Sequence, residues 1–351
     1  MASATSFDIN TRIRKNILAM KPYSSARDEF TGEAEVFLDA NENPYQSAFN
    51  RYPDPLQWKI KEKLAPIKGV RPTQIFLGNG SDEPIDLIIR AFCEPNQDAV
   101  LICSPTYGMY SVCADVNAVT VQSAPLTPSY DLDTEAIFKT INASTKVIFL
   151  CSPNNPSANL LNRKKVLEIV TVFEGIVVID EAYIDFAGSE SYLRLLDKYP
   201  NLIVLQTFSK AWGLAALRCG MAYSSEEIIA VLNKIKYPYN INIQTQELVL
   251  QALGNEKQKN AWVDEILMER IRLSEALSQL KIVQKVYPSD ANFVLAKVTN
   301  AGEVYRSLMN EKIIVRDRSK VTLCEDCLRI TVGTPAENEK LVNTLKNLQN
   351  K

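Results

Sequence analysis

The chain of 351 residues contains no histidine. This absence excludes a Ser-His-Asp triad, a Cys-His catalytic pair and any metal site that depends on imidazole ligands. General acid–base catalysis would have to fall to lysine, tyrosine, aspartate, glutamate or cysteine. The composition therefore favours chemistry that a lysine carries.

Long apolar runs are also missing, and those present are well short of the roughly 18 residues that indicate a membrane span. The N-terminal stretch MASATSFDINTRIRKN lacks the apolar core of a signal peptide. The net charge of −2 lacks the basic excess typical of a nucleic-acid-binding surface. We expect a cytoplasmic protein that binds neither membrane nor nucleic acid.

Cysteine is scarce and scattered, with seven residues that lie mostly in apolar surroundings. We interpret them as reduced, packed thiols. Cys324 and Cys327 form one CxxC pair, but neither a second pair nor a histidine completes a zinc site. The sequence therefore predicts no metal.

Short apolar segments alternate with helical segments between residues 75 and 206, the pattern of an α/β fold with a mostly parallel sheet and helices on both faces. The expected strands are residues 75–77, 99–103, 146–151, 176–180 and 202–206. Beyond about residue 245 the sequence predicts a long helical stretch, 245–280, and strands at 291–296 and 328–332. We predict a large domain over residues 48–245, a smaller α+β domain over residues 246–351, and an N-terminal arm, residues 1–47, that joins the smaller domain.

Polar side chains follow the predicted strands at their carboxyl ends, where such sheets bind ligands. They are Gly80–Ser81, Tyr107, Asn155, Asp180 with Tyr183, and Ser209–Lys210. Ser81 begins an expected helix, whose free N–H groups and dipole suit a phosphate. A single glycine-rich turn often binds nothing, but the convergence of five loops on one rim predicts a ligand site.

Lys210 follows the apolar strand 202–206 among small and apolar residues. Loss of water around the ammonium would lower its pKa, and a neutral amine can attack a carbonyl. Asp180 lies 30 residues earlier and would suit the ring nitrogen of pyridoxal phosphate. The alternative is an ordinary solvated lysine in a connecting loop.

Short motifs run along nearly the whole chain: KPYSSAR, LDANENP, RYPDP, GNGSDE, SPTYGMY, CSPNNP, VIDEAY, FSKAWGLAALRCG, IIVRD and CLRITVGT. In these motifs the chain resembles the aminotransferases of the aspartate-aminotransferase fold, a large family that uses pyridoxal 5′-phosphate. Within that family it most resembles the histidinol-phosphate aminotransferases. The resemblance implies the type I fold of these enzymes, with a seven-stranded sheet, and a homodimer with shared active sites.

The resemblance also implies a role for each site residue. Lys210 would hold the cofactor, Asp180 would pair with its ring nitrogen, Asn155 and Tyr183 would bond the ring hydroxyl, and Tyr107 would stack on the ring. The expected phosphate-binding residues are Ser81, Asp82, Ser209, Arg218 and Tyr52 of the neighbouring subunit.

Tyr23, Asn155, Arg316 and Arg329 match the family's substrate-binding residues. A guanidinium can bind a carboxylate and a phosphate in turn, because it offers parallel donors to either. The implied reaction, in L-histidine biosynthesis, exchanges an amino group between the pair L-glutamate and 2-oxoglutarate and the pair histidinol phosphate and imidazole-acetol phosphate. Lys210 would move the proton, since no histidine is present.

One departure from the family pattern is visible. Where relatives read NPTG, this chain has Asn155-Pro156-Ser157-Ala158, and loss of the glycine is expected to stiffen the turn. Three alternative functions stay open: an aromatic amino acid aminotransferase, a lyase resembling threonine-phosphate decarboxylase, and a non-catalytic cofactor-binding regulator.

Overall fold

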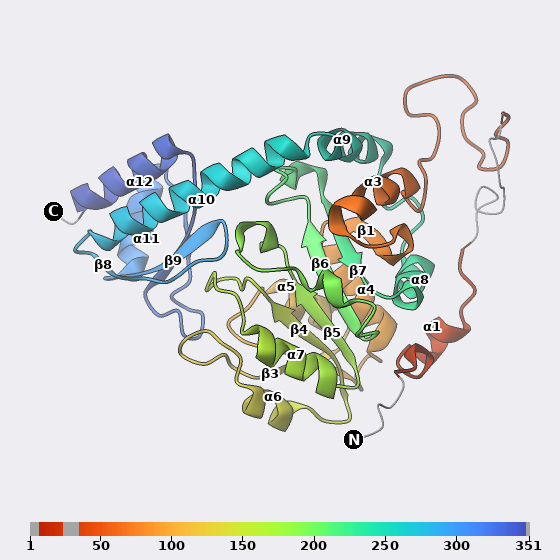
Figure 1. Cartoon of the computed structure of the whole chain (residues 1–351), viewed down its shortest axis with the longest axis horizontal. Helices are drawn as coiled ribbons and strands as arrows, with labels where there is room; N and C mark the ends of the chain where they lie inside the picture. The colour runs from red at the N-terminus through yellow and green to blue at the C-terminus, as the bar shows by residue number, and fades with distance from the viewer. Residues whose placement is uncertain (1–6, 24–34, 349–351) are drawn as a thin grey trace.

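The computed structural model describes residues 7–23 and 35–348, with helices packed around two sheets (Figure 1). The larger sheet has the order β1-β7-β6-β5-β4-β2-β3. Its strands are β1 (Ile75–Asn79), β2 (Ala99–Ile102), β3 (Thr120–Ser123), β4 (Thr145–Cys151), β5 (Ile176–Asp180), β6 (Leu202–Thr207) and β7 (Cys219–Tyr223). Within this sheet β7 runs antiparallel to both its neighbours, and the other pairs are parallel. The predicted α/β fold with a mostly parallel sheet is confirmed.

Helices cover both faces of this sheet because its central strands are apolar on both sides. In β5, Ile176 and Val178 pack into one core cluster, while Val177 and Ile179 pack into the other. One face is covered by α3 (Trp58–Lys68), α6 (Thr134–Thr140), α7 (Arg163–Val172) and α9 (Ile243–Leu253). The other face is covered by α4 (Asp82–Phe92), α5 (Met109–Val116) and α8 (Glu226–Ile235).

The smaller sheet is antiparallel, in the order β10-β11-β9-β8. Its strands are β8 (Val283–Val286), β9 (Phe293–Val298), β10 (Arg316–Asp317) and β11 (Cys327–Thr331), with helices α10 (Glu256–Ser278), α11 (Ala301–Asn310) and α12 (Pro335–Leu348). The long helical stretch predicted over residues 245–280 is two helices, because α9 ends at Gly254 and α10 begins after Asn255.

The larger sheet with its helices forms one half of the molecule, and the smaller sheet with its helices forms the other. The two halves meet in a small apolar cluster, called the junction cluster below. It contains Ala158, Tyr183, Phe186, Ala211, Val263, Ala291 and Phe293. Helix α10 runs along both halves (Figure 1) and fixes this junction, since Arg270 Nη1 donates to the carbonyl oxygens of Phe186 (3.1 Å) and Ala291 (2.9 Å). The carboxyl ends of the parallel strands therefore open beside the smaller sheet.

The first described residues pack on the larger sheet and its helices. Ile13 is buried in the core cluster of α4 and α8, the Arg14 N–H donates to the Ala91 carbonyl (2.9 Å), and Lys234 Nζ donates to the Leu18 carbonyl (3.0 Å). Residues 7–20, with α1 (Lys15–Ala19), thus pack on the larger half rather than on the smaller sheet. The domain boundaries stay a prediction.

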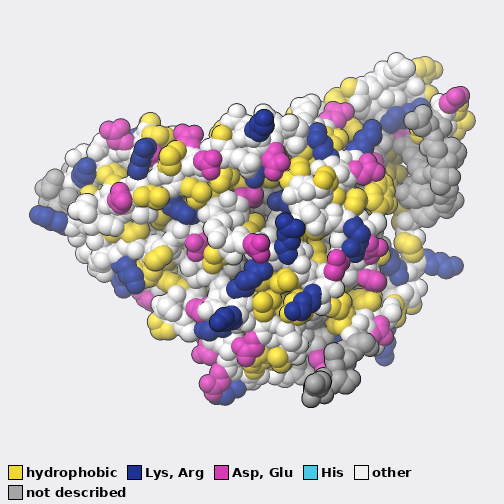
Figure 2. Space-filling view, in the orientation of Figure 1, with side chains coloured by type: hydrophobic (Ala, Val, Ile, Leu, Met, Phe, Trp, Pro, Cys, Tyr) yellow, Lys and Arg dark blue, Asp and Glu magenta, His cyan; other side chains and the backbone are white. Residues whose placement is uncertain are grey.

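The surface carries charges of both signs. On the face seen in Figure 2, lysines and arginines are interspersed with aspartates and glutamates. In the described ranges, no helix combines the length and apolarity needed to cross a bilayer. The same ranges hold no group of three or more cysteine, aspartate or glutamate side chains arranged for a metal ion.

Candidate functional site

The rim predicted to bind a ligand lies at the carboxyl ends of the parallel strands. Lys210 follows β6 there, and its ammonium lies within electrostatic reach of Asp180 at the end of β5 and of Arg329 on β11. Arg218, just before β7, acts on the same ammonium. The structure therefore brings together side chains that are far apart in the sequence.

Asp180 is an almost completely buried carboxylate, 3% exposed. Tyr110 Oη donates to its Oδ2 (2.7 Å), and the Ala182 N–H donates to its Oδ1 (3.0 Å). Burial raises its pKa. Within residues 7–23 and 35–348, no lysine or arginine forms an ion pair with it. A buried carboxylate of this kind is stabilised by a cationic ligand.

Lys210 is open to solvent on one side, while the site around it removes water from the ammonium on the others. This desolvation lowers its pKa, and the charge of Arg329 lowers it further. Its Nζ lies 5.7 Å from the centre of the Tyr183 ring. The Lys210 amine is therefore accessible to a ligand and has a lowered affinity for its proton.

A hydrogen-bonded chain crosses the junction between the two halves. Arg329 Nη1 donates to Asn155 Oδ1 (2.6 Å), and Asn155 Nδ2 donates to Tyr183 Oη (3.3 Å). Tyr183 in turn packs edge-on against Phe293 of β9, with ring centroids 5.1 Å apart. These contacts hold Asn155 and Tyr183, both buried, beside Lys210.

The start of α4 forms a cradle for an anion. Ser81 is the N-cap residue, but its side chain makes no capping hydrogen bond, so first-turn N–H groups stay available. Gly80 has φ +73°, and a Cβ there would stand 2.5 Å from Arg218 Nη2. Only a residue without a side chain lets the guanidinium approach this closely, so turn and arginine form one polar surface.

Arg218 connects the remaining residues of this cradle. Its Nη1 donates to Ser209 Oγ (3.5 Å), and its Nη2 pairs with Asp82 Oδ2 (3.3 Å). Tyr107 Oη donates to the other oxygen of Asp82 (3.0 Å). N–H groups, hydroxyls and a guanidinium on one rim suit a phosphate dianion.

The open side of the cradle is partly apolar. A depression of about 590 Å³ beside Arg218 is lined by Phe49, Leu217 and Leu248, among others. Phe49 is 62% exposed and Leu248 44% exposed. Exposed apolar side chains next to a polar site are typical of a surface that a protein partner covers.

Three predicted residues lie outside this cluster of contacts or at its edge. Tyr23 is exposed and lines a shallow depression with Pro55 and Lys234. Tyr52 stacks on Tyr239, with centroids 4.4 Å apart. Arg316 is exposed and stands directly opposite Arg329 in the β10–β11 pair, so the two side chains share a face.

Ala158 adopts the backbone conformation for which glycine is the usual choice. Its φ is +70°, its N–H donates to the Asn154 carbonyl (2.8 Å), and its carbonyl accepts from the Asp290 N–H (2.7 Å). The left-handed conformation costs alanine about 1 kcal/mol. Its methyl group is fully buried in the junction cluster, and this burial contributes about 0.8 kcal/mol to the free energy of unfolding. Burial of the Ala158 methyl group therefore offsets most of the conformational cost of having alanine in place of the glycine of NPTG.

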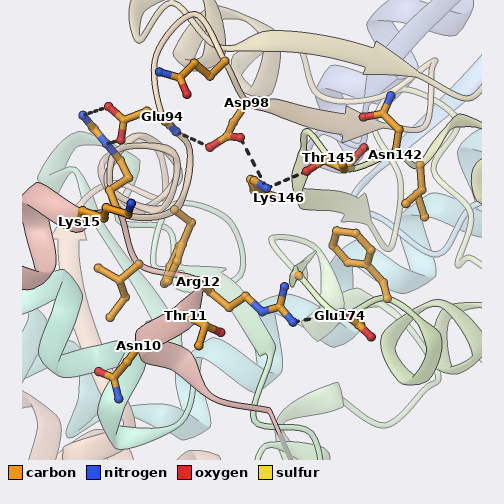
Figure 3. A pocket seen from close by; sticks show the side chains of 18 of the residues that line it. Asn10, Thr11, Arg12, Lys15, Glu94, Asp98, Asn142, Thr145, Lys146 and Glu174 are labelled. Atoms are coloured by element: carbon orange, nitrogen blue, oxygen red, sulfur yellow. Dashed lines mark hydrogen bonds and ion pairs between the residues drawn. The ribbon is translucent and has the colours of Figure 1, made fainter. Parts of the chain in front are cut away.

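A larger depression, of about 1300 Å³, lies away from this rim (Figure 3). It is bounded by residues 10–16, the start of β4 and the end of α7. Its arginines are already paired, Arg12 with Glu174 (3.3 Å) and Arg14 with Glu94 (3.1 Å). Most of the side chains predicted from the sequence lie at the strand carboxyl ends instead.

Tyr110 lies in the motif SPTYGMY, but its role is visible only in the folded structure. Tyr110 is fully buried and stacks on Phe149, with centroids 4.8 Å apart. The feature of the sequence that could have indicated this residue is its spacing of three from Tyr107 near the start of a helix, because residues three apart on a helix lie on the same side. Its contact with Asp180 depends on how α5 packs on the sheet.

This fold, with these side chains on the rim, is that of an aminotransferase. A family model described as aminotransferase class I and II matches residues 29–345. A protein of Parabacteroides distasonis named histidinol-phosphate aminotransferase is 57% identical over 342 residues, which cover 97% of this chain and 99% of that protein. The chain belongs to the histidinol-phosphate aminotransferase family of class I and II aminotransferases.

Solved structures agree with this fold. The histidinol-phosphate aminotransferase of Clostridium acetobutylicum superimposes with a TM-score of 0.80 at 25% identity, over 86% of this chain and 91% of that one. That of Sinorhizobium meliloti, solved in complex with pyridoxal-5′-phosphate, gives a TM-score of 0.79 at 22% identity, over 86% and 83%. At 22% identity, the similarity to the Sinorhizobium meliloti structure supports the fold alone.

Proposed function

We propose that the protein exchanges an amino group between L-glutamate and 2-oxoglutarate on one side and histidinol phosphate and imidazole-acetol phosphate on the other, in L-histidine biosynthesis. The observation that carries the proposal is the 57% identity, over nearly the full length, to a histidinol-phosphate aminotransferase. The site supplies the matching chemistry: a lysine with a lowered pKa, a buried carboxylate and arginines for anionic substrates.

Pyridoxal 5′-phosphate fits the residues of this site. Asp180 is buried without a cationic partner in the described chain and suits a protonated ring nitrogen. The Gly80 turn, Ser209 and Arg218 suit the phosphate. When bound, the cofactor draws electrons from the substrate carbon and so makes its proton removable.

The chain's own residues would divide the remaining work. Lys210 would hold the cofactor and, once freed, accept and return the substrate proton at Nζ, because its pKa is lowered. Asn155 and Tyr183 would bond the ring hydroxyl, and Tyr107 would cover the ring face. The N–H groups of Ser81 and Asp82, with Ser209 and Arg218, would bind the phosphate.

Substrate anions would be bound by the arginines of the smaller half. Arg329 has its second guanidinium edge available beyond the bond to Asn155, and Arg316 stands opposite it. Tyr23 would add a donor. In this proposal the active unit is a homodimer in which Tyr52 of the partner subunit reaches the phosphate. The exposed apolar residues beside Arg218 support a partner there. The seven buried, unbridged cysteines support a cytoplasmic location.

The visible absorbance of the purified protein tests the function directly. The expected result is a band from bound cofactor that disappears when histidinol phosphate alone is added and returns with 2-oxoglutarate. A band that only phenylalanine or tyrosine removes would select the aromatic aminotransferase. Release of carbon dioxide from threonine phosphate would select the lyase. No band after addition of pyridoxal phosphate would refute the cofactor assignment.

Tyr110 gives a prediction about cofactor affinity. The variant Tyr110→Phe keeps the buried ring but removes the donor to Asp180, so the ionised carboxylate loses one of its two hydrogen bonds. We expect the dissociation constant for pyridoxal phosphate, measured by fluorescence titration, to rise about tenfold.

Tyr223 offers the matched control for that measurement. It is also fully buried, and its hydroxyl has no hydrogen-bond partner in the described chain. The variant Tyr223→Phe should leave cofactor affinity unchanged. Equal weakening in both variants would mean that Tyr110 acts through packing alone.

A further inference from the structure

Three arginines lie on one face of the β10–β11 pair. Arg316 and Arg329 are direct cross-strand partners, so their side chains share a face. Arg318 is two residues beyond Arg316, and its N–H continues the pairing by donating to the Cys327 carbonyl (2.9 Å). Because side chains alternate along a strand, Arg318 points to the same side as Arg316.

None of these guanidinium groups is neutralised by a carboxylate in the described chain. Arg329 donates to the neutral amide of Asn155, and Arg316 and Arg318 form no side-chain hydrogen bond or ion pair with any described residue. The Nε of Arg318 is buried and unpartnered. Burial lowers the pKa of Arg318, and the charges of Arg329 and Arg316 lower it further.

Such a cluster destabilises the fold unless an anion completes it. Like charges placed opposite each other in a sheet repel, and a buried donor without an acceptor loses its hydration. The phenol of Tyr183 lies within electrostatic reach of Arg318, which places the guanidinium on the side of the catalytic rim. An anionic substrate bound at this rim would supply the missing acceptor.

We propose that Arg318 is a third anion-binding residue, and that it makes the site prefer a phosphate monoester dianion to a carboxylate. This inference rests on the proposed function. A carboxylate carries one charge and is satisfied by a single forked guanidinium, which Arg329 supplies. A phosphate monoester carries nearly two charges at pH 7 and three acceptor oxygens, enough for Arg316 and Arg318 as well.

The test compares Arg318→Gln with the wild-type holoenzyme on each substrate separately. We expect the KM for histidinol phosphate to rise about 10- to 100-fold, the loss of one charge-assisted hydrogen bond to the dianion. The KM for L-glutamate should change less than about threefold, because Arg329 remains for one carboxylate and Arg316 for the other. Arg318→Lys, which keeps the charge but not the fork, should recover part of the loss.

Arg306 provides the matched control, since it is an exposed arginine on α11 of the same half. Arg306→Gln should change neither KM. The melting temperature of Arg318→Gln should equal or exceed that of the wild type, since an unneutralised charge is removed. Equal increases in both KM values, or no change for histidinol phosphate, would overturn the specificity role.

Binding of inorganic phosphate, measured by calorimetry, separates this inference from the proposed function. If the wild type does not act on histidinol phosphate, the proposed function fails. A weaker affinity for inorganic phosphate in Arg318→Gln than in Arg306→Gln would then still support a phosphate site at Arg318. Equal affinities in the two variants would overturn it.

Discussion

Replacement of Lys210 by alanine is expected to reduce turnover by about 10⁴-fold or more, the loss of both the cofactor attachment and the general acid–base group. The structure places no second lysine beside Asp180 in the described residues, so no neighbour can substitute. The measurement is single-turnover kinetics with L-glutamate. A parallel readout is the mass of the protein after borohydride reduction, which should increase by the mass of the cofactor, less one water and plus two hydrogens, in the wild type only.

Lys61 is a suitable control for this variant. It is a buried lysine on α3 whose pKa is lowered to about 8 by burial and by the charge of Lys236. Lys61→Met should keep full turnover. Lys210→Ala should melt at the same temperature as the wild type or higher, because Arg329 and Arg218 already disfavour its charge. Substantial turnover in Lys210→Ala would remove the basis of the proposed mechanism.

Asp180→Asn is expected to lower kcat by roughly 100- to 1000-fold, a loss comparable to removal of one preorganised electrostatic group. The amide oxygen can still accept from the Ala182 N–H, and the amide NH2 can donate to Tyr110 Oη instead, so the geometry should be preserved while the charge is lost. The same variant should raise the melting temperature of the cofactor-free protein, because burial makes the ionised carboxylate costly.

The pH dependence of that stability difference follows from the raised pKa of Asp180. A group whose pKa is higher in the folded state contributes stability below its unfolded pKa and loses it as pH rises through the folded value. The gain in Asp180→Asn should therefore be small near about pH 4 and larger near about pH 7. Asp185→Asn, which breaks an ion pair with Lys259 (3.1 Å), is the control and should leave kcat unchanged. A melting temperature lowered at both pH values would contradict the argument.

Much of the fold could be predicted because the central strands are buried on both faces. Continuously apolar runs span residues 147–151 of β4, 176–179 of β5 and 202–205 of β6, the pattern of short strands buried on both faces. Two strands of the larger sheet escaped prediction for physical reasons. β3 is a partly exposed edge strand of the sequence TVQS, and β7, of the sequence CGMAY, forms a strand because it pairs with β1 on one side and β6 on the other. Its strand character lies in tertiary pairing rather than in local pattern.

The site residues also form two groups: those that the local sequence pattern indicates, and those whose contacts only the folded structure reveals. Asp180, Asn155 and Lys210 could be located from their positions after apolar strands, since parallel strands bring their carboxyl ends to one edge. The contact of Tyr110 with Asp180 joins residues 70 positions apart and has no local signal. The roles of Tyr23 and Tyr52 stay predictions.

The lack of histidine and the burial of every thiol have a consequence for kinetics. Burial raises the pKa of each of the seven cysteines, and no imidazole is present. Apart from the amino terminus, no side chain with an ordinary pKa changes charge between about pH 5.5 and 8. The groups of the protein that titrate across neutrality are therefore those whose pKa burial has shifted, such as Lys61, whose pKa is lowered to about 8. An inflection seen there in a rate profile reports such a group, the cofactor or the substrate, and one that persists in Lys61→Met is left to the site, the cofactor or the substrate.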